Sequence, residues 1–187
     1  MDYEYYYNSA RSRYYNACSE ISSCQNRING LKQQKQQKIN QINQLHSDIS
    51  NHEDAYEQMT QIVSTSADLT DQIQDITTKT DTATTNFLNM VEASDITSKN
   101  LNDVYSYEMS QTQRTLTSIL DTLQTRKTTL SDKIATLKSQ LQTAENELED
   151  IKSRIRSAQS SLSDWQRNKS NAAYDMEYYR HKMQEAV

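Results

Sequence analysis

Histidine and cysteine are the side chains with which this chain could bind a metal ion or carry out acid–base and nucleophilic chemistry. The three histidines, His46, His52 and His181, have no second histidine four residues away and no neighbouring cysteine, so the spacing of a helical zinc site is missing. Cys18 and Cys24 lie six residues apart on one predicted helix, about 9 Å along its axis, which is beyond the reach of a disulfide. We therefore expect no metal site, and we interpret the cysteines as free thiols that pack as small apolar residues.

Acidic side chains are concentrated in the sequence ENELED, residues 145–150, where two carboxylates could act as a general acid and a general base. A bare coiled coil offers no concave pocket for a substrate, so we interpret these acids as a solvated helix face. The single glycine, Gly30, leaves no material for a glycine-rich phosphate loop or a nucleophile elbow. We expect a protein that is not an enzyme, with no catalytic residue and no cofactor.

Tyrosine is concentrated at the two ends of the chain. Nine of the twelve tyrosines lie in the first fifteen or the last fourteen residues: Tyr3, Tyr5, Tyr6, Tyr7, Tyr14, Tyr15, Tyr174, Tyr178 and Tyr179. Tyrosine beside arginine is the composition that is enriched where proteins bind proteins. What these rings can do therefore depends on whether the two ends of the chain meet.

The composition predicts which elements must position them. The chain has no proline and one glycine, whereas sheets and doubly wound folds need many turns made with these residues. Its apolar share of 34% is below the roughly 45–50% of globular domains, as is typical of helices with one apolar stripe each. We expect an all-α protein with very few connections.

The charge and hydropathy of the chain limit its partners and its location. The net charge of −5 is spread over interleaved acids and bases, so no basic face favours nucleic acid. No stretch approaches the roughly 18 apolar residues of a membrane span, and the first residues do not have the pattern of a signal peptide. We expect a soluble protein that is cytoplasmic or is exported without a cleavable signal peptide.

Two heptad tracts dominate the sequence. Fifteen of eighteen a and d positions between Tyr3 and Val63 are apolar or aromatic, as are nineteen of twenty-one between Leu116 and Ala186. The exceptions are His52 and four lysines: Lys35, Lys38, Lys127 and Lys169. Polar residues in a coiled-coil seam either fix the register or extend out of the seam to water, and the sequence leaves both roles open for the lysines.

A weaker stripe joins the two tracts. It contains Leu69, Ile73, Ile76, Thr80, Ala83, Phe87 and Met90, and it is displaced by one residue from the first tract. The displacement predicts a possible break near residues 64–68, and Ser94 or Asp95 is a helix-capping residue that places a turn near residues 91–95. The fold class we predict is therefore all-α: a long antiparallel helical hairpin, forming a coiled coil, with residues 1–187 as one domain.

An antiparallel hairpin about this midpoint pairs residues whose numbers sum to about 186–189, and large side chains then face small ones, as in Ile28 opposite Ala158. The two termini come together. Five tyrosines lie outside the seam there, with basic residues among them. The partner-binding residues that we predict are Tyr5, Tyr6, Tyr15, Tyr174, Tyr178, Arg11, Arg13 and Arg180. Because a two-helix hairpin leaves each stripe partly exposed, the partner is another helical protein or a second copy of the chain.

The sequence YYYNSARSRYYNACSEISSCQNRINGLKQQKQQKINQINQL, residues 5–45, resembles the small helical proteins encoded beside LXG toxins of the bacterial type VII secretion system, within the broader WXG superfamily. The resemblance covers mainly the first 60 residues and consists of tyrosines that lead into a Ser-, Asn- and Gln-rich heptad helix. It implies an accessory or targeting partner, chaperone-like, that binds the helical targeting domain of a toxin. The alternative function is a cytoplasmic coiled-coil scaffold or spacer.

Overall fold

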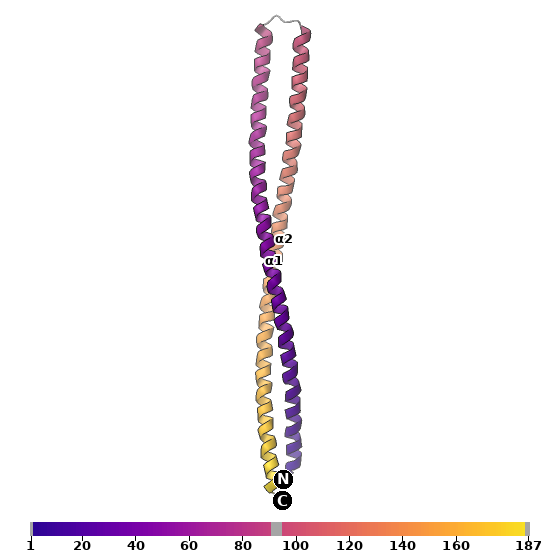
Figure 1. The fold of residues 1–187 in the computed structure, drawn as a ribbon, viewed down its shortest axis with the longest axis vertical. Coiled ribbons are helices and arrows are strands. Elements are labelled where there is room, and N and C mark those ends of the chain that lie inside the picture. The colour runs from indigo at the N-terminus through magenta and orange to yellow at the C-terminus, as the bar shows by residue number, and fades with distance from the viewer. Residues whose placement is uncertain (1, 91–94, 186–187) are drawn as a thin grey trace. The chain divides into compact units, whose positions relative to one another are not determined.

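The computed structural model describes residues 2–90 and 95–185, with the side chains of residues 87–102 left out of the description. It contains two α-helices, α1 (Tyr3–Met90) and α2 (Asp95–Glu185), and no strand in the described residues. The helices pack against each other in opposite directions (Figure 1). The all-α antiparallel hairpin is therefore confirmed. Most of the predicted turn, at residues 91–95, lies outside the described residues.

Local chemistry explains why such long helices form from so polar a sequence. Asp2 caps the start of α1, because its Oδ1 accepts a hydrogen bond of 3.0 Å from the backbone N–H of Tyr5. Threonine is tolerated inside both helices, because its hydroxyl donates to the carbonyl oxygen four residues earlier, as Thr77 does to Ile73 at 2.8 Å. Gly30 lies within α1, and a side chain there would meet nothing within 4 Å.

The chain divides into two compact units, each containing a stretch of both helices. Unit 1 comprises Met1–His46 and Gln140–Val187, and unit 2 comprises Ser47–Ser139. Ion pairs between the helices mark the register: Arg13–Asp175 at 2.9 Å and Lys38–Glu147 in unit 1, and Lys138–Glu53 at 2.7 Å in unit 2. The residue numbers of these pairs sum to 188, 185 and 191, close to the predicted sum of 186–189.

The core of unit 1 is a narrow apolar seam. Ile28, Leu31 and Ala158 are buried, and Ile155 and Leu162 pack against them. Ala10, Ala17 and Ala172 are also buried, at 1% exposure or less. Every predicted seam position of unit 1 in the described residues is buried or half-buried. Ile28 and Ala158 belong to one cluster, as the predicted pairing of large with small side chains requires.

Unit 2 corrects two predictions. Helix α1 is continuous through residues 64–68, so the possible break there is absent. The displaced stripe is also wrong, because Leu69 and Ile76 are exposed and the register of the first tract continues without a shift. The positions that continue this seam beyond Val63 are half-buried and mostly carry hydroxyls: Ser66, Thr70, Ile73, Thr77, Thr80 and Thr84. An unbroken helix fixes which side chains face α2, whatever their polarity.

Three of the four seam lysines have a partner on the other helix. Lys38 Nζ lies 2.5 Å from a carboxylate oxygen of Glu147. Lys169 Nζ lies 5.3 Å from the centre of the Tyr14 ring, and Lys127 Nζ lies 5.4 Å from that of Tyr56. These contacts favour a role in fixing the register. The acids of residues 145–150 also pair with bases, since Glu149 accepts a hydrogen bond of 2.6 Å from Lys152.

Candidate protein-binding surface

The joined ends of α1 and α2 in unit 1 carry a continuous series of four phenol rings. Tyr6 of α1 stacks on Tyr179 of α2, with ring centres 5.4 Å apart and planes at 22°. Tyr5 contacts Tyr6 edge-on at 5.5 Å, and Tyr178 contacts Tyr179 in the same way at 5.2 Å. Both distances are within the range of favourable aromatic pairs. The stacked pair therefore connects the two helices through their surface as well as through the seam.

A second series of aromatic and cationic groups begins about two helical turns further along α1. Lys169 lies over Tyr14, Tyr14 contacts Tyr15 edge-on at 5.8 Å, and the guanidinium of Arg11 lies 5.7 Å from the centre of the Tyr15 ring. Each cation lies within the distance at which ring quadrupoles attract positive charge. Because these contacts restrict their rotamers, the rings of Tyr14 and Tyr15 are held in defined orientations.

Two of the predicted arginines are held by acids on α2. Arg13 donates a hydrogen bond of 2.9 Å to Asp175, and Arg180 donates one of 2.5 Å to Glu177, three residues earlier on the same helix. Both arginines are more than half exposed, so their remaining N–H groups still face solvent. The arginines therefore present donors in fixed positions between the tyrosines.

An open groove runs along the exposed side of the α2 end. Tyr174 and Tyr178 line it together with a row of charged or titratable side chains: Glu177, His181, Lys182 and Glu185. The pKa of Lys182 is raised and that of Glu185 is lowered, first by the hydrogen bond between the two side chains and then by their opposite charges. The groove thus offers apolar rings beside charges that are already paired.

All five predicted off-seam tyrosines are exposed, between 41% for Tyr6 and 72% for Tyr174. The predicted partner-binding residues lie together in unit 1, and we call them, with Tyr179, the terminal tyrosine surface. Sequence reasoning missed Tyr179 as a member because its d position assigned it to the seam. Its number and that of Tyr6 sum to 185, one below the predicted range of 186–189, so the pairing rule places the two rings within one residue of each other. Tyr107 in unit 2 is 62% exposed, but it belongs neither to the predicted partner-binding residues nor to the terminal tyrosine surface.

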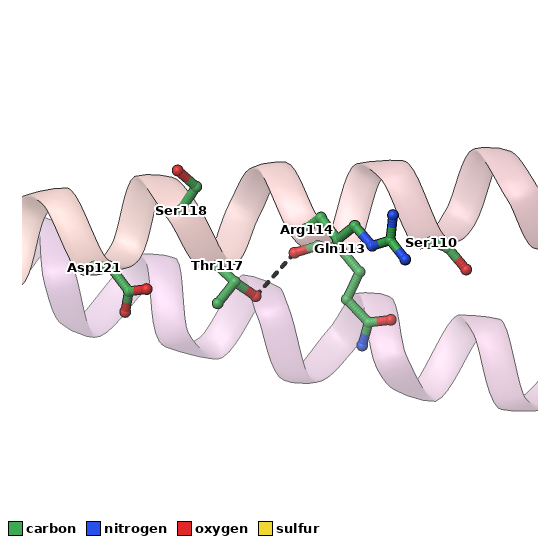
Figure 2. A pocket seen from close by; sticks show the side chains of 6 residues that line it. All are labelled: Ser110, Gln113, Arg114, Thr117, Ser118 and Asp121. Atoms are coloured by element: carbon green, nitrogen blue, oxygen red, sulfur yellow. Dashed lines mark hydrogen bonds between the residues drawn. The ribbon is translucent and has the colours of Figure 1, made fainter.

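A second, polar groove lies on α2 within unit 2 (Figure 2). Its walls carry Ser110, Gln113, Arg114, Thr117, Ser118 and Asp121. The Thr117 hydroxyl donates a hydrogen bond of 2.9 Å to the Gln113 carbonyl oxygen, as the dashed line in Figure 2 shows. The side chains spread along one helix face instead of converging on a point, so this groove offers no constellation of groups for catalysis.

The described residues contain no group of three or more His, Cys, Asp or Glu side chains that could hold a metal ion. Within the same part of the chain, neither helix is apolar enough over a long enough stretch to cross a membrane. No protein-family model matches the chain, and comparison with curated proteins and with solved structures finds no significant match.

Proposed function

We propose that this chain is a non-enzymatic interaction module that binds another α-helical protein through the terminal tyrosine surface. The observation that carries the proposal is the continuous ring series Tyr5–Tyr6–Tyr179–Tyr178, exposed on both helices at the end where the termini meet. Tyrosine, tryptophan and arginine are enriched among the few residues that supply most of the binding energy in protein interfaces. A helix of the partner laid beside this end would complete a bundle of three or more helices.

The geometry supports binding with little loss of side-chain entropy. Tyr6 and Tyr15 are each held by a neighbouring ring, and Arg13 is held by Asp175. Ordering a flexible side chain at an interface costs about 0.5–1.5 kcal/mol, which side chains that are already positioned largely avoid. The phenol hydroxyls remain free to bond to polar groups of the partner while the rings cover its apolar side chains.

The partner that we propose is the helical targeting domain of an LXG-type toxin, with this chain as its accessory or targeting factor. The support is the resemblance of residues 5–45 to the small helical proteins encoded beside such toxins. Five members of the terminal tyrosine surface fall within that stretch: Tyr5, Tyr6, Arg11, Arg13 and Tyr15. The resembling sequence and the candidate binding surface therefore coincide in α1.

The test is a binding titration with the purified helical domain of an LXG toxin encoded beside the gene for this chain. The triple variant Tyr6→Ser/Tyr15→Ser/Tyr178→Ser should weaken binding by several kcal/mol, because single aromatic hot spots contribute about 2 kcal/mol or more. Its circular dichroism should change little, and its melting temperature should fall only slightly, because all three rings are exposed and only Tyr6 loses a contact with the other helix, the stacked one to Tyr179. The control is Tyr107→Ser, which replaces a tyrosine of unit 2 that is 62% exposed, and this variant should bind normally.

Two results would overturn the proposal. If the triple variant binds as tightly as the wild type, the tyrosines only cover the helix ends, and a scaffold or spacer becomes the better hypothesis. If the wild-type chain does not bind the toxin domain, the proposed partner is wrong. A pull-down with wild-type and triple-variant bait, compared by mass spectrometry, then shows whether any other helical protein depends on these rings.

A further inference from the structure

The two faces of the helix pair in unit 2 differ in polarity. In heptad terms, one face carries the g positions of both helices and the opposite face carries the e positions. Three consecutive g positions of α1 are aliphatic, Ile62, Leu69 and Ile76, and Ile119 is a g position of α2. All four are close to half exposed, between 46% and 55%. We call these four residues the apolar face.

The register places these residues in one patch. In an antiparallel pair the g positions of the two helices lie on the same side, and the Arg13–Asp175 ion pair is such a g–g contact, with numbers that sum to 188. The same sum pairs Leu69 with Ile119 in unit 2. Ile62 and Ile76 lie one heptad to either side on α1, so the patch extends over about four turns.

The opposite face of unit 2 is polar. Its e positions include Ser110 and Thr117, which line the groove of Figure 2, and Gln74 on α1. The seam between the faces holds hydroxyls, such as Thr70 and Thr77, at positions that usually hold leucine or isoleucine. This part of α1 therefore places three of its larger aliphatic side chains, Ile62, Leu69 and Ile76, outside the seam in one row towards solvent, which a lone helix pair does not need.

Charge identifies the occupant of this face. Most side chains that flank the apolar face are uncharged: Thr65, Gln72, Thr112, Thr115 and Thr122. Arg126, the g position of α2 that the sum of 188 pairs with Ile62, is the charged residue at the other edge of the patch. Lys79, at the edge of the patch, is paired with Asp75 at 2.6 Å. Two copies can thus approach through this face without opposing like charges at its centre. We propose that the apolar face binds the apolar face of a second copy of this chain, forming a four-helix bundle at unit 2.

Charge also selects the arrangement of the two copies. Residues 48–76 of α1 contain seven Asp or Glu and no Lys or Arg. The residues of α2 that lie beside them, 112–140, contain five Lys or Arg and two Asp. In a parallel stack, with the two-fold axis along the helices, α1 lies over α2 of the second copy, and Leu69 meets Ile119. An antiparallel stack would lay the acidic stretch of α1 against itself. The parallel stack is therefore the arrangement we propose.

The first test measures the mass of the chain in solution by sedimentation equilibrium. The wild type should have twice the monomer mass of 21.7 kDa at micromolar concentration. Leu69→Glu/Ile119→Glu should weaken association by more than about a hundredfold, because four carboxylates would then be buried in the dimer. The control Gln74→Glu/Thr117→Glu adds the same charge to exposed positions of the polar face and should remain dimeric.

Several results would overturn self-association. A monomeric wild type would overturn it, and the apolar face would then be a binding site for another helical protein. A Leu69→Glu/Ile119→Glu variant that stays dimeric would also overturn it. Helicity measured on each variant verifies the fold, and Ile76→Glu is a second variant with a smaller expected effect. The inference is independent of the proposed function, since Tyr6→Ser/Tyr15→Ser/Tyr178→Ser should remain dimeric whether or not it binds a partner.

The second test separates the two arrangements by disulfide formation. Cys18 and Cys24 are first changed to serine, and Leu69→Cys and Ile119→Cys are then made as separate chains. On mixing and mild oxidation, the parallel stack should give mainly the mixed disulfide between the two chains. Predominant Leu69→Cys homodimers would show an antiparallel stack and overturn the proposed arrangement.

Discussion

Units 1 and 2 are built on the same antiparallel heptad geometry but fill it with different side chains. In unit 1 the seam contains Ile28 and Leu31 against Ala158, all 7% exposed or less. In unit 2 the α1 seam beyond Val63 contains mainly Ser and Thr, and all of these side chains are only half-buried. Free energy from apolar burial scales with the area removed from water, so unit 1 must supply most of the stability.

The surfaces of the two units differ in the opposite sense. The g–g face of unit 1 is polar and includes the Arg13–Asp175 ion pair, whereas that of unit 2 is aliphatic around Leu69 and Ile119. Unit 1 thus has a complete core and a polar exterior with tyrosines at its end. In unit 2 the α1 seam beyond Val63 is rich in hydroxyls, and one of its two faces is aliphatic. The difference indicates that unit 2 gains more stability than unit 1 from a second layer of helices at its g–g face.

The largest effect that tests this comparison is a matched pair of truncations at d positions of α1. Leu31→Ala in unit 1 should lower the free energy of unfolding by about 2–5 kcal/mol, because Leu31 is 3% exposed and leaves a cavity. Ile73→Ala in unit 2 should cost about 1 kcal/mol, because Ile73 is only half-buried. Urea unfolding followed by circular dichroism measures both, and equal losses would contradict the difference in core quality.

A smaller effect comes from replacing a hydroxyl of the unit 2 seam by a methyl group of the same shape. Thr77→Val should raise the free energy of unfolding by about 0.5–1 kcal/mol, because a half-buried hydroxyl bonded only to the Ile73 carbonyl oxygen is replaced by an apolar group. The control is Thr125→Val, in which an exposed threonine with the same kind of bond is replaced. A loss of stability at position 77 would mean that unit 2 depends on its seam hydroxyls.

The fold could be predicted from sequence because heptad periodicity, the lack of proline and the pairing of large with small residues all point to one hairpin. The register failed at Leu69 and Ile76, because we assigned the apolar residues to the seam, whereas a continuous helix holds Thr70 and Thr77 there. Periodicity shows that a helix has an apolar face, but two adjacent faces one residue apart cannot be distinguished without the partner helix.

The candidate surface was predictable only in part, for a similar reason. Heptad positions separated exposed tyrosines such as Tyr5 and Tyr178 from seam tyrosines, and the exposures agree. They did not show that Tyr179 belongs to both groups, stacking on Tyr6 outside the seam. A tyrosine side chain is long enough for its ring to reach the surface from a seam position. Heptad positions, which describe only where each Cα lies, therefore miss this contact.

The smallest effect concerns charge at the terminal end of unit 1. Because the pKa of Glu185 is lowered by its hydrogen bond to Lys182, the pair contributes stability above the ordinary carboxyl pKa of 4.5, and this contribution is lost as the pH falls through the lowered value. Glu185→Gln should therefore melt slightly below the wild type at pH 7 and equally with it in acid. The effect is small because the pair is exposed to water. Glu145→Gln, which removes the same charge from the same unit, is the control. A difference that persists in acid would show that Glu185 acts through packing, and the end of unit 1 would then depend on contacts more than on charge.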